Sequence, residues 1–214
     1  MTMLQVIAAL GLLALLASVV KHIEFTQLRS SKLQQHLVFG AAASVFVLWI
    51  FRAGIYEGLD VHFLWLSALA LTLGVRFALL AGTAALLGVT ALGYEQWQML
   101  GVNGLLGVAV PIVITHLIYN ISFHRLPRNL FLYIFVCAFI PGAALIALKM
   151  FLLGSYYVID GTYDWLTVKD NFLILIPLML FPEGMLNGMT MTLLIIYKPH
   201  WVYTFHDKFY IDGK

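Results

Sequence analysis

The stretch HFLWLSALALTLGVRFALLAGTAALLGVTALG, residues 62–93, decides the fold class of this chain. It is almost continuously apolar, and it is too long for a single membrane-spanning helix, which needs about 20 residues. Gly74-Val75-Arg76 interrupts it with a glycine and a charge. We therefore predict two spans that meet at this break, one over residues 62–73 plus a further turn and the other over residues 77–93.

Further apolar stretches on both sides of this pair are long enough to cross a bilayer. They cover residues 4–20, 37–56, 102–123, 130–153 and 172–197. The first charge, Lys21, follows the first stretch, whereas a signal peptide carries positive charge before its apolar region, so we expect a retained span. The chain has no internal repeat and no flexible linker. The sequence therefore predicts a single integral membrane domain, residues 1–214, with about seven transmembrane helices.

The composition supports an all-α polytopic membrane helix bundle. Hydrophobic residues make up 62% of the chain and charged residues 10%, and the mean hydropathy is +0.95. Soluble domains carry about 25% charged residues, so this chain cannot cover a water-facing surface. The single cysteine, Cys137, excludes an intrachain disulfide and a thiolate metal cage, and we expect it to be a packing residue.

The distribution of charge predicts the topology, because cytoplasmic loops retain lysine and arginine. If the N-terminus is outside, the cytoplasmic segments hold Lys21, Arg29, Lys32, Arg76, Arg125, Arg128, Lys198, Lys208 and Lys214. The outer loops then hold one basic residue, Lys169, and most of the acidic ones. We predict an outside N-terminus and a cytoplasmic C-terminus in the bacterial inner membrane. The aromatic segment 200–205 should lie on the cytoplasmic surface, where His200 and His206 would be interfacial residues.

Charges within the predicted spans are candidates for chemistry, since they cost a few kcal/mol in a bilayer. Glu183 lies near the middle of the last span, beside Pro182. It could be a buried carboxylate that stabilises the bundle, or a site or gating residue. In either case it should face the interior and meet a polar partner from among Asn103, Asn187, Arg52, Lys149 and His116. Arg52 and Lys149 themselves lie toward the outer ends of their spans, from which they are expected to reach the interface.

His62 follows an acidic loop at the mouth of the third predicted span. Neutral imidazole is a common ligand of transition metals, and the nearby Glu57 and Asp60 would attract cations. A simple boundary residue is the alternative interpretation. The chain has no phosphate-binding Gly-Lys-Ser/Thr loop, no His-Glu-x-x-His helix and no Gly-x-Ser-x-Gly elbow, so we expect neither ATP hydrolysis by this chain alone nor an enzyme.

Several short motifs follow one another in a distinctive order. The small-residue run FGAAASVF covers residues 39–46, His62-Phe63-Leu64 begins the next apolar stretch, and Leu100-Gly101-Val102-Asn103 precedes a glycine-rich helix. Pro182-Glu183-Gly184 lies near the end. This order resembles the integral membrane substrate-binding subunit of cobalt/nickel-type energy-coupling-factor transporters. The motifs cover about a third of the chain, and the rest is similar in topology.

The resemblance implies a permease-like, substrate-binding membrane subunit of an ABC transporter, with a transition-metal ion as its substrate. A scaffold membrane subunit and cytoplasmic ATPases would be its partners, besides the lipid bilayer. No permanently bound cofactor and no nucleic acid are expected. The implied substrate site comprises His62, Asn103 and Glu183, with His62 as the metal ligand.

The family's metal site also uses a terminal amine and a histidine from an N-terminal Met-His-Ile-Pro-Asp-Gly loop. This chain begins Met1-Thr2-Met3-Leu4, so half of the expected site is missing. Thioethers of Met1 and Met3 could add ligands that suit copper(I). We therefore expect weak metal binding or a different solute. Two other classes stay open, a solitary secondary carrier with Glu183 as a proton relay and a non-transporting assembly or anchor protein.

Overall fold

The computed structural model describes residues 1–23, 25–127 and 129–205, so predictions for Arg128, His206, Lys208 and Lys214 lie outside the described residues. The fold is all-α over this part of the chain. The helices are α1 Met3–Lys21, α2 Phe25–Ser30, α3 Lys32–Ile50, α4 Leu66–Ala91, α5 Leu100–Val102, α6 Val110–Arg125, α7 Leu130–Leu132, α8 Ile140–Ile159, α9 Trp165–Asn171 and α10 Ile176–Tyr197.

Two of these helices are extended by π-helical segments. Asn103–Ala109 joins α5 to α6, and Tyr133–Phe139 joins α7 to α8. Each segment ends two residues before a proline, Pro111 or Pro141. Because proline has no backbone N–H and crowds the preceding turn, the regular hydrogen-bond ladder cannot continue through it, and a wider turn accommodates the mismatch.

Six helices in the described part of the chain are long and apolar enough to cross a membrane. They cover Met3–Lys21, Lys32–Ile50, Leu66–Ala91, Trp97–Arg125, Leu130–Ile159 and Trp165–Tyr197. This confirms the predicted polytopic helix bundle. The helix α4 contains a kink at Gly74, where φ is 73° and ψ is 163°, and so the predicted break is also confirmed.

The third predicted span is only partly helical. Residues 62–65 are not helical, and α4 begins at Leu66, so its first arm has residues 66–73 and is about 12 Å long. That is too short to cross a bilayer by itself. The prediction of a helix from His62 onward was wrong because the backbone N–H groups of Leu64 and Trp65 bind the carboxylate of Glu183. The predicted second span also ends earlier, at Ile50.

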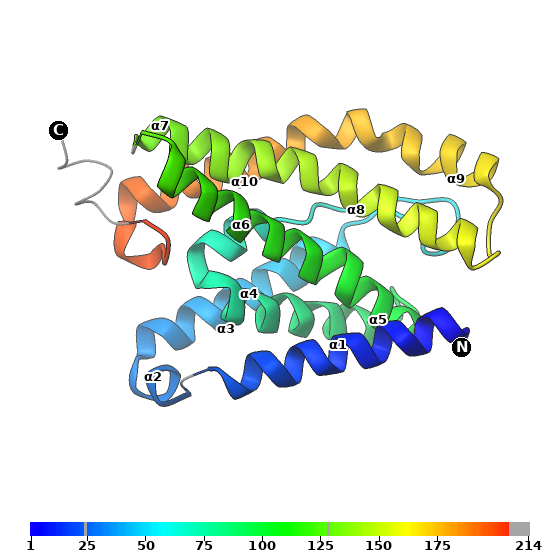
Figure 1. Ribbon diagram of the computed structural model, residues 1–214, viewed down its shortest axis with the longest axis horizontal. Coiled ribbons are helices and arrows are strands. Elements are labelled where there is room, and N and C mark those ends of the chain that lie inside the picture. Colours follow the sequence, from blue (N-terminus) through cyan, green and yellow to red (C-terminus); the bar gives the residue numbers. More distant parts are fainter. Residues whose placement is uncertain (24, 128, 206–214) are drawn as a thin grey trace.

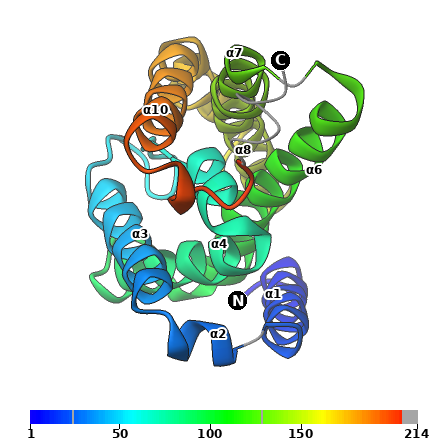
Figure 2. The same ribbon diagram turned by 90° about the vertical axis from the view of Figure 1, so that its left-hand side faces the viewer.

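The helices run between two ends of the bundle, with α4 in the middle (Figures 1 and 2). The N-terminus, α5 and α9 lie at one end, which we call the N-terminal end, and α2, α7 and the segment after α10 lie at the other. In the most apolar stretch of α4, 67% of the residues are buried, compared with 17% in the corresponding stretches of α1 and α3. The two arms of α4, residues 66–91, therefore form a central hairpin that the other helices surround.

The segment that follows α10 packs against the kink in α4. Backbone N–H groups of Tyr203 and Thr204 donate to the carbonyls of Thr72 and Leu71, at 3.0 and 3.2 Å. These carbonyls belong to the last turn of the first arm and would otherwise lack partners. Val202, Thr204 and Phe205 are buried. These three residues thus cap the first arm of α4 from within the fold, contrary to the expectation of a surface segment, whereas His200 and Tyr203 stay exposed.

Gly74→Ala should lower stability by about 1–3 kcal/mol, because the backbone conformation there is one that only glycine adopts at low cost. The added methyl group would also lie 3.0 Å from Cδ1 of Tyr203. Thermal unfolding in detergent micelles measures the effect. Gly40→Ala, in regular helix with open space around the added methyl group, is the control and should not be destabilised. Equal stability of the two variants would contradict the assignment.

Candidate functional site

The loop of residues 51–65 connects α3 to α4 and carries the first side chains of the site. Ala53 and Val61 exchange two backbone hydrogen bonds, of 3.0 and 2.8 Å, which close the loop into a short hairpin. Gly58 provides the turn, with a φ of 77°. The loop returns from the N-terminal end into the bundle before α4 begins (Figure 1). Its fold brings Arg52, Asp60 and His62 together.

Glu183 fixes the inner end of this loop. Its two carboxylate oxygens accept from the N–H groups of Leu64 and Trp65, both at 2.8 Å, and from Nδ2 of Asn187 at 2.7 Å. Asn187 Oδ1 in turn accepts from the N–H of Ala68. Glu183 is 1% exposed. The prediction that it faces the interior with a polar partner is confirmed, and Asn187 is the predicted donor.

An ionic cluster lies beneath the loop. Arg52 Nη1 is 2.9 Å from Asp60 Oδ2 and 2.6 Å from Glu95 Oε1. Asn103 Nδ2 donates to the other Glu95 oxygen at 2.8 Å. Arg52 also donates from Nε to the carbonyl of Trp49. The expectation that Arg52 extends to the membrane interface was wrong, because two carboxylates lie within its reach inside the fold.

His62 and Lys149 meet beside this cluster. Lys149 Nζ of α8 lies 3.2 Å from His62 Nε2, and His62 Nδ1 lies 3.1 Å from the carbonyl of Phe63. Both side chains are buried, with residue exposures of 7% for His62 and 6% for Lys149. Lys149 therefore does not extend to the interface either, again contrary to expectation. The His62 ring is also 5.3 Å from the ring of Trp49.

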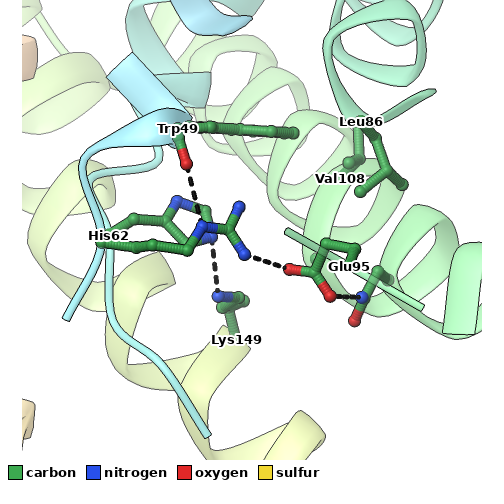
Figure 3. Close-up of a pocket in the computed structure, with 9 residues that line it drawn as sticks. Trp49, His62, Leu86, Glu95, Val108 and Lys149 are labelled. Carbon is green, nitrogen blue, oxygen red and sulfur yellow. Dashed lines mark hydrogen bonds and ion pairs between the residues drawn. The ribbon is translucent and has the colours of Figure 1, made fainter. Parts of the chain in front are cut away.

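These side chains line a cavity of about 20 Å³ (Figure 3). Its lining residues are Trp49, Arg52, His62, Leu86, Glu95, Asn103, Gly107, Val108 and Lys149. That volume holds about one water molecule or ion. The structure thus brings His62 and Asn103 to one cavity, as predicted, whereas Glu183 does not line it.

A second, larger cavity of about 140 Å³ adjoins the first through Glu95. It is lined by Gln5, Glu57, Gly58, Gly93, Tyr94, Glu95, Gln96, Met99, Tyr157, Thr162 and Tyr163. Carboxylate, amide and phenol groups therefore surround it, and none of its lining residues in the described part of the chain is a lysine or arginine. We call this second cavity the vestibule.

The sequence comparison decides the family. Residues 2–201 match the model of the cobalt uptake substrate-specific transmembrane region. The chain belongs to this family. It is therefore a substrate-specific membrane component of a metal-uptake transporter, which agrees with the resemblance and with the expectation of a transport protein. No curated protein matches the chain.

Two solved structures share the fold of this family member. The crystal structure of a truncated transition metal transporter has a TM-score of 0.73 and 18% identity, over 90% of this chain and 94% of that one. A crystal structure of a transition metal transporter has a TM-score of 0.65 and 18% identity, over 90% of this chain and 86% of the other.

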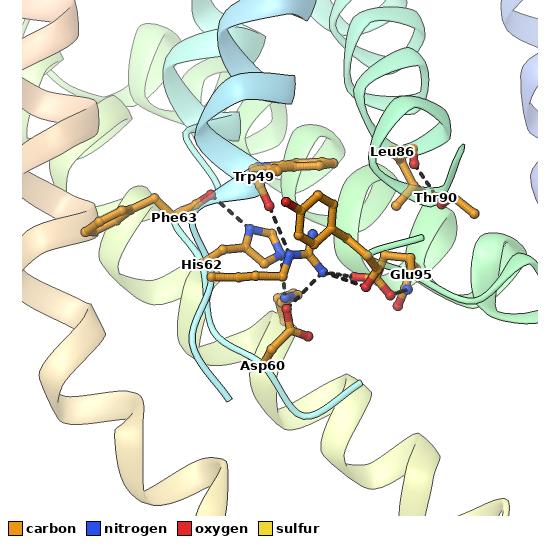
Figure 4. A network of polar contacts seen from close by, with 11 residues as sticks. Trp49, Asp60, His62, Phe63, Leu86, Thr90 and Glu95 are labelled. Atoms are coloured by element: carbon orange, nitrogen blue, oxygen red, sulfur yellow. Dashed lines mark hydrogen bonds and ion pairs between the residues drawn. The ribbon is translucent and has the colours of Figure 1, made fainter. Parts of the chain in front are cut away.

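The pKa of the Glu95 carboxyl group is subject to opposing effects. Burial raises its pKa, and the charge of Asp60 raises it further, while the hydrogen bond and charge of Arg52 lower it. Figure 4 shows Asp60, His62 and Glu95 around this centre. The described residues contain no group of three histidine, cysteine, aspartate or glutamate side chains arranged to hold a metal ion. The site of this family member thus differs from a simple cluster of anionic ligands.

The sequence pointed to two of the residues that line this cavity, His62 and Asn103, but not to Arg52, Glu95 and Lys149 beside them. Their signal was present, since charges within or next to apolar spans usually face partners. What the sequence did not reveal is that residues from four separate segments meet at one point.

Glu183→Gln should destabilise the subunit by about 1–3 kcal/mol, because the new amide N–H₂ would face a backbone N–H that needs an acceptor. Thermal unfolding in detergent measures the change. The matched control is Glu57→Gln, since Glu57 is exposed and accepts a single hydrogen bond from Gln96. If both variants unfold at the wild-type temperature, Glu183 does not anchor the loop.

Proposed function

We propose that this chain is the substrate-binding subunit of an energy-coupling-factor ABC transporter, with a transition-metal ion bound in the cavity at His62. The observation that carries the proposal is this water-sized cavity, which a histidine, Asn103 and Glu95 line together. Imidazole nitrogen suits nickel, copper, zinc and iron, whereas magnesium and calcium prefer oxygen ligands. The site is therefore suited to a transition metal more than to a hard cation.

Each of the three predicted site residues receives a distinct role in this proposal. His62 is the metal ligand. Asn103 donates the 2.8 Å hydrogen bond to Glu95 and so holds this carboxylate in place at the cavity. Glu183 acts at a distance, because it binds the backbone of Leu64 and Trp65 and so positions the loop that carries His62. Its oxygens are occupied by donors, which favours this anchoring role over a proton relay.

The vestibule offers a path for the ion to the cavity. It lies next to Glu95, and its carboxylates, Glu57 and Glu95, would attract cations. Loops that the charge distribution assigns to the outside surround it. In this proposal the ion enters the vestibule from outside the bacterial inner membrane and passes Glu95 to reach His62.

Partners would supply the energy for release to the cytoplasm. The sequence contains no nucleotide-binding loop, so cytoplasmic ATPases and a scaffold membrane subunit are the expected partners. Large apolar side chains on the outer face of α1 are exposed, among them Met3, Ile7 and Leu10. They provide a surface for the lipid bilayer or for another membrane helix.

His62→Ala should reduce uptake of cobalt or nickel at least tenfold in cells that contain the complete transporter, because it removes the imidazole ligand. Radioactive or elemental uptake measurements report the change, with the amount of protein in the membrane determined in parallel. His36→Ala is the control, since His36 is exposed and lies away from this cavity. Normal uptake by a stably expressed His62→Ala protein would refute the site.

Cysteine labelling tests the proposed orientation. In a Cys137→Ser background, Asp160→Cys should react with a membrane-impermeant maleimide on intact spheroplasts. Arg29→Cys should react only after permeabilisation, because basic loops stay in the cytoplasm. Labelling of both cysteines from the same side would contradict the topology, and the reverse pattern would place the N-terminus inside.

A further inference from the structure

We infer that Lys149 is a built-in competitor of the metal ion for His62 and thereby determines which ions the cavity accepts. The inference rests on the proposed function. It starts from one contact, the 3.2 Å distance between Lys149 Nζ and His62 Nε2 (Figure 3). His62 belongs to the loop of residues 51–65 and Lys149 belongs to α8. The contact is therefore created by the tertiary fold and not by the local sequence.

The contact occupies the electron pair that a metal would need. His62 Nδ1 faces the carbonyl of Phe63 at 3.1 Å. A carbonyl can only accept, so Nδ1 carries the proton and Nε2 carries the free electron pair. Lys149 Nζ, which has only N–H donors when charged, then donates to that pair. The nitrogen that would bind the metal is already used by an internal hydrogen bond.

Metal and lysine cannot occupy this position together. A zinc ion, as an example of a transition metal, lies about 2.0–2.1 Å from an imidazole nitrogen. Lys149 Nζ lies 3.2 Å from the same nitrogen, so an ion at its usual distance would collide with the amine and, if the amine is charged, be repelled by it. Within the described residues, His62 is the only hydrogen-bond partner of Nζ. Metal binding must therefore move the end of this side chain.

Arg52 likewise occupies carboxylate oxygens that a metal ion could bind. Its Nη1 lies 2.9 Å from Asp60 and 2.6 Å from Glu95, two carboxylates that could otherwise contribute to a metal site. Internal cations thus hold the histidine and both carboxylates. The cavity is therefore lined by potential metal ligands that internal cations already contact.

The surroundings allow the lysine to move. Gly107 faces its stem, and even a methyl group at Gly107 would lie 3.8 Å from Lys149 Cε. The cavity itself adds about 20 Å³ of space. An ion that binds imidazole strongly can displace Lys149, whereas magnesium and calcium, which prefer oxygen, gain too little from one imidazole. The lysine thereby makes the site selective for nitrogen-binding transition metals at the expense of affinity.

The test measures cobalt binding to the purified full-length subunit in lipid nanodiscs, by equilibrium dialysis with metal analysis. Lys149→Met keeps the apolar stem and removes the amine, so Co²⁺ should bind at least tenfold more tightly than to the wild type. Lys169→Met is the matched control, because this lysine is 53% exposed, and its affinity should not change. The double variant His62→Ala/Lys149→Met should lose the gain.

Lys149→Gln is the second variant, and it guards against poor folding of Lys149→Met. Its amide can still donate to Nε2 but carries no charge, so we expect an affinity between those of the wild type and Lys149→Met. Thermal unfolding establishes that each variant is folded before binding is measured.

The outcomes separate this inference from the proposed function. If His62→Ala weakens Co²⁺ binding but neither Lys149 variant strengthens it, His62 is the site and Lys149 is not its competitor. If His62→Ala leaves Co²⁺ binding unchanged in both the wild-type and the Lys149→Met background, both the proposed site and the inference fail. Tight binding of Mg²⁺ by wild type would also overturn the selectivity argument.

Discussion

The site depends on one interaction, the capture of two backbone N–H groups by the carboxylate of Glu183. The first N–H groups of any helix lack internal partners, and in an apolar bundle each must find an acceptor. Glu183 supplies acceptors to Leu64 and Trp65, and Asn187 supplies one to Ala68. This lets the chain enter the bundle as an irregular loop and begin α4 deep inside. The position of His62 follows directly from it.

The second constraint is the neutralisation of buried charge. Two basic side chains, Arg52 and Lys149, and two acidic ones, Asp60 and Glu95, lie in or beside one cavity between apolar helices. Such groups are tolerated in a low-dielectric interior only when they are paired and hydrogen-bonded. The pairing also takes up the groups that a cation would use. In the proposed function, stability and ligand binding would therefore compete for the same side chains.

In the proposed function, this competition would also affect how the ion is released. A transporter subunit must bind its substrate firmly enough to capture it and weakly enough to release it. An internal lysine that returns to His62 when the ion leaves would assist release, because the vacated imidazole is stabilised at once. The kink at Gly74 and the tail that caps it stabilise the far end of the first arm of α4, and Glu183 binds the loop at the near end of that arm.

The sequence by itself determined the membrane bundle, the break at Gly74 and the interior position of Glu183, because apolar length, a glycine beside a charge and the cost of a charge in lipid are local properties. It also singled out His62 and Asn103 through motif order. Only the tertiary structure decided that residues 62–65 are not helical and that Arg52 and Lys149 turn inward. Those outcomes depend on partners from distant segments, since the fold brings Asp60 and Glu95 within reach of Arg52 and His62 within reach of Lys149.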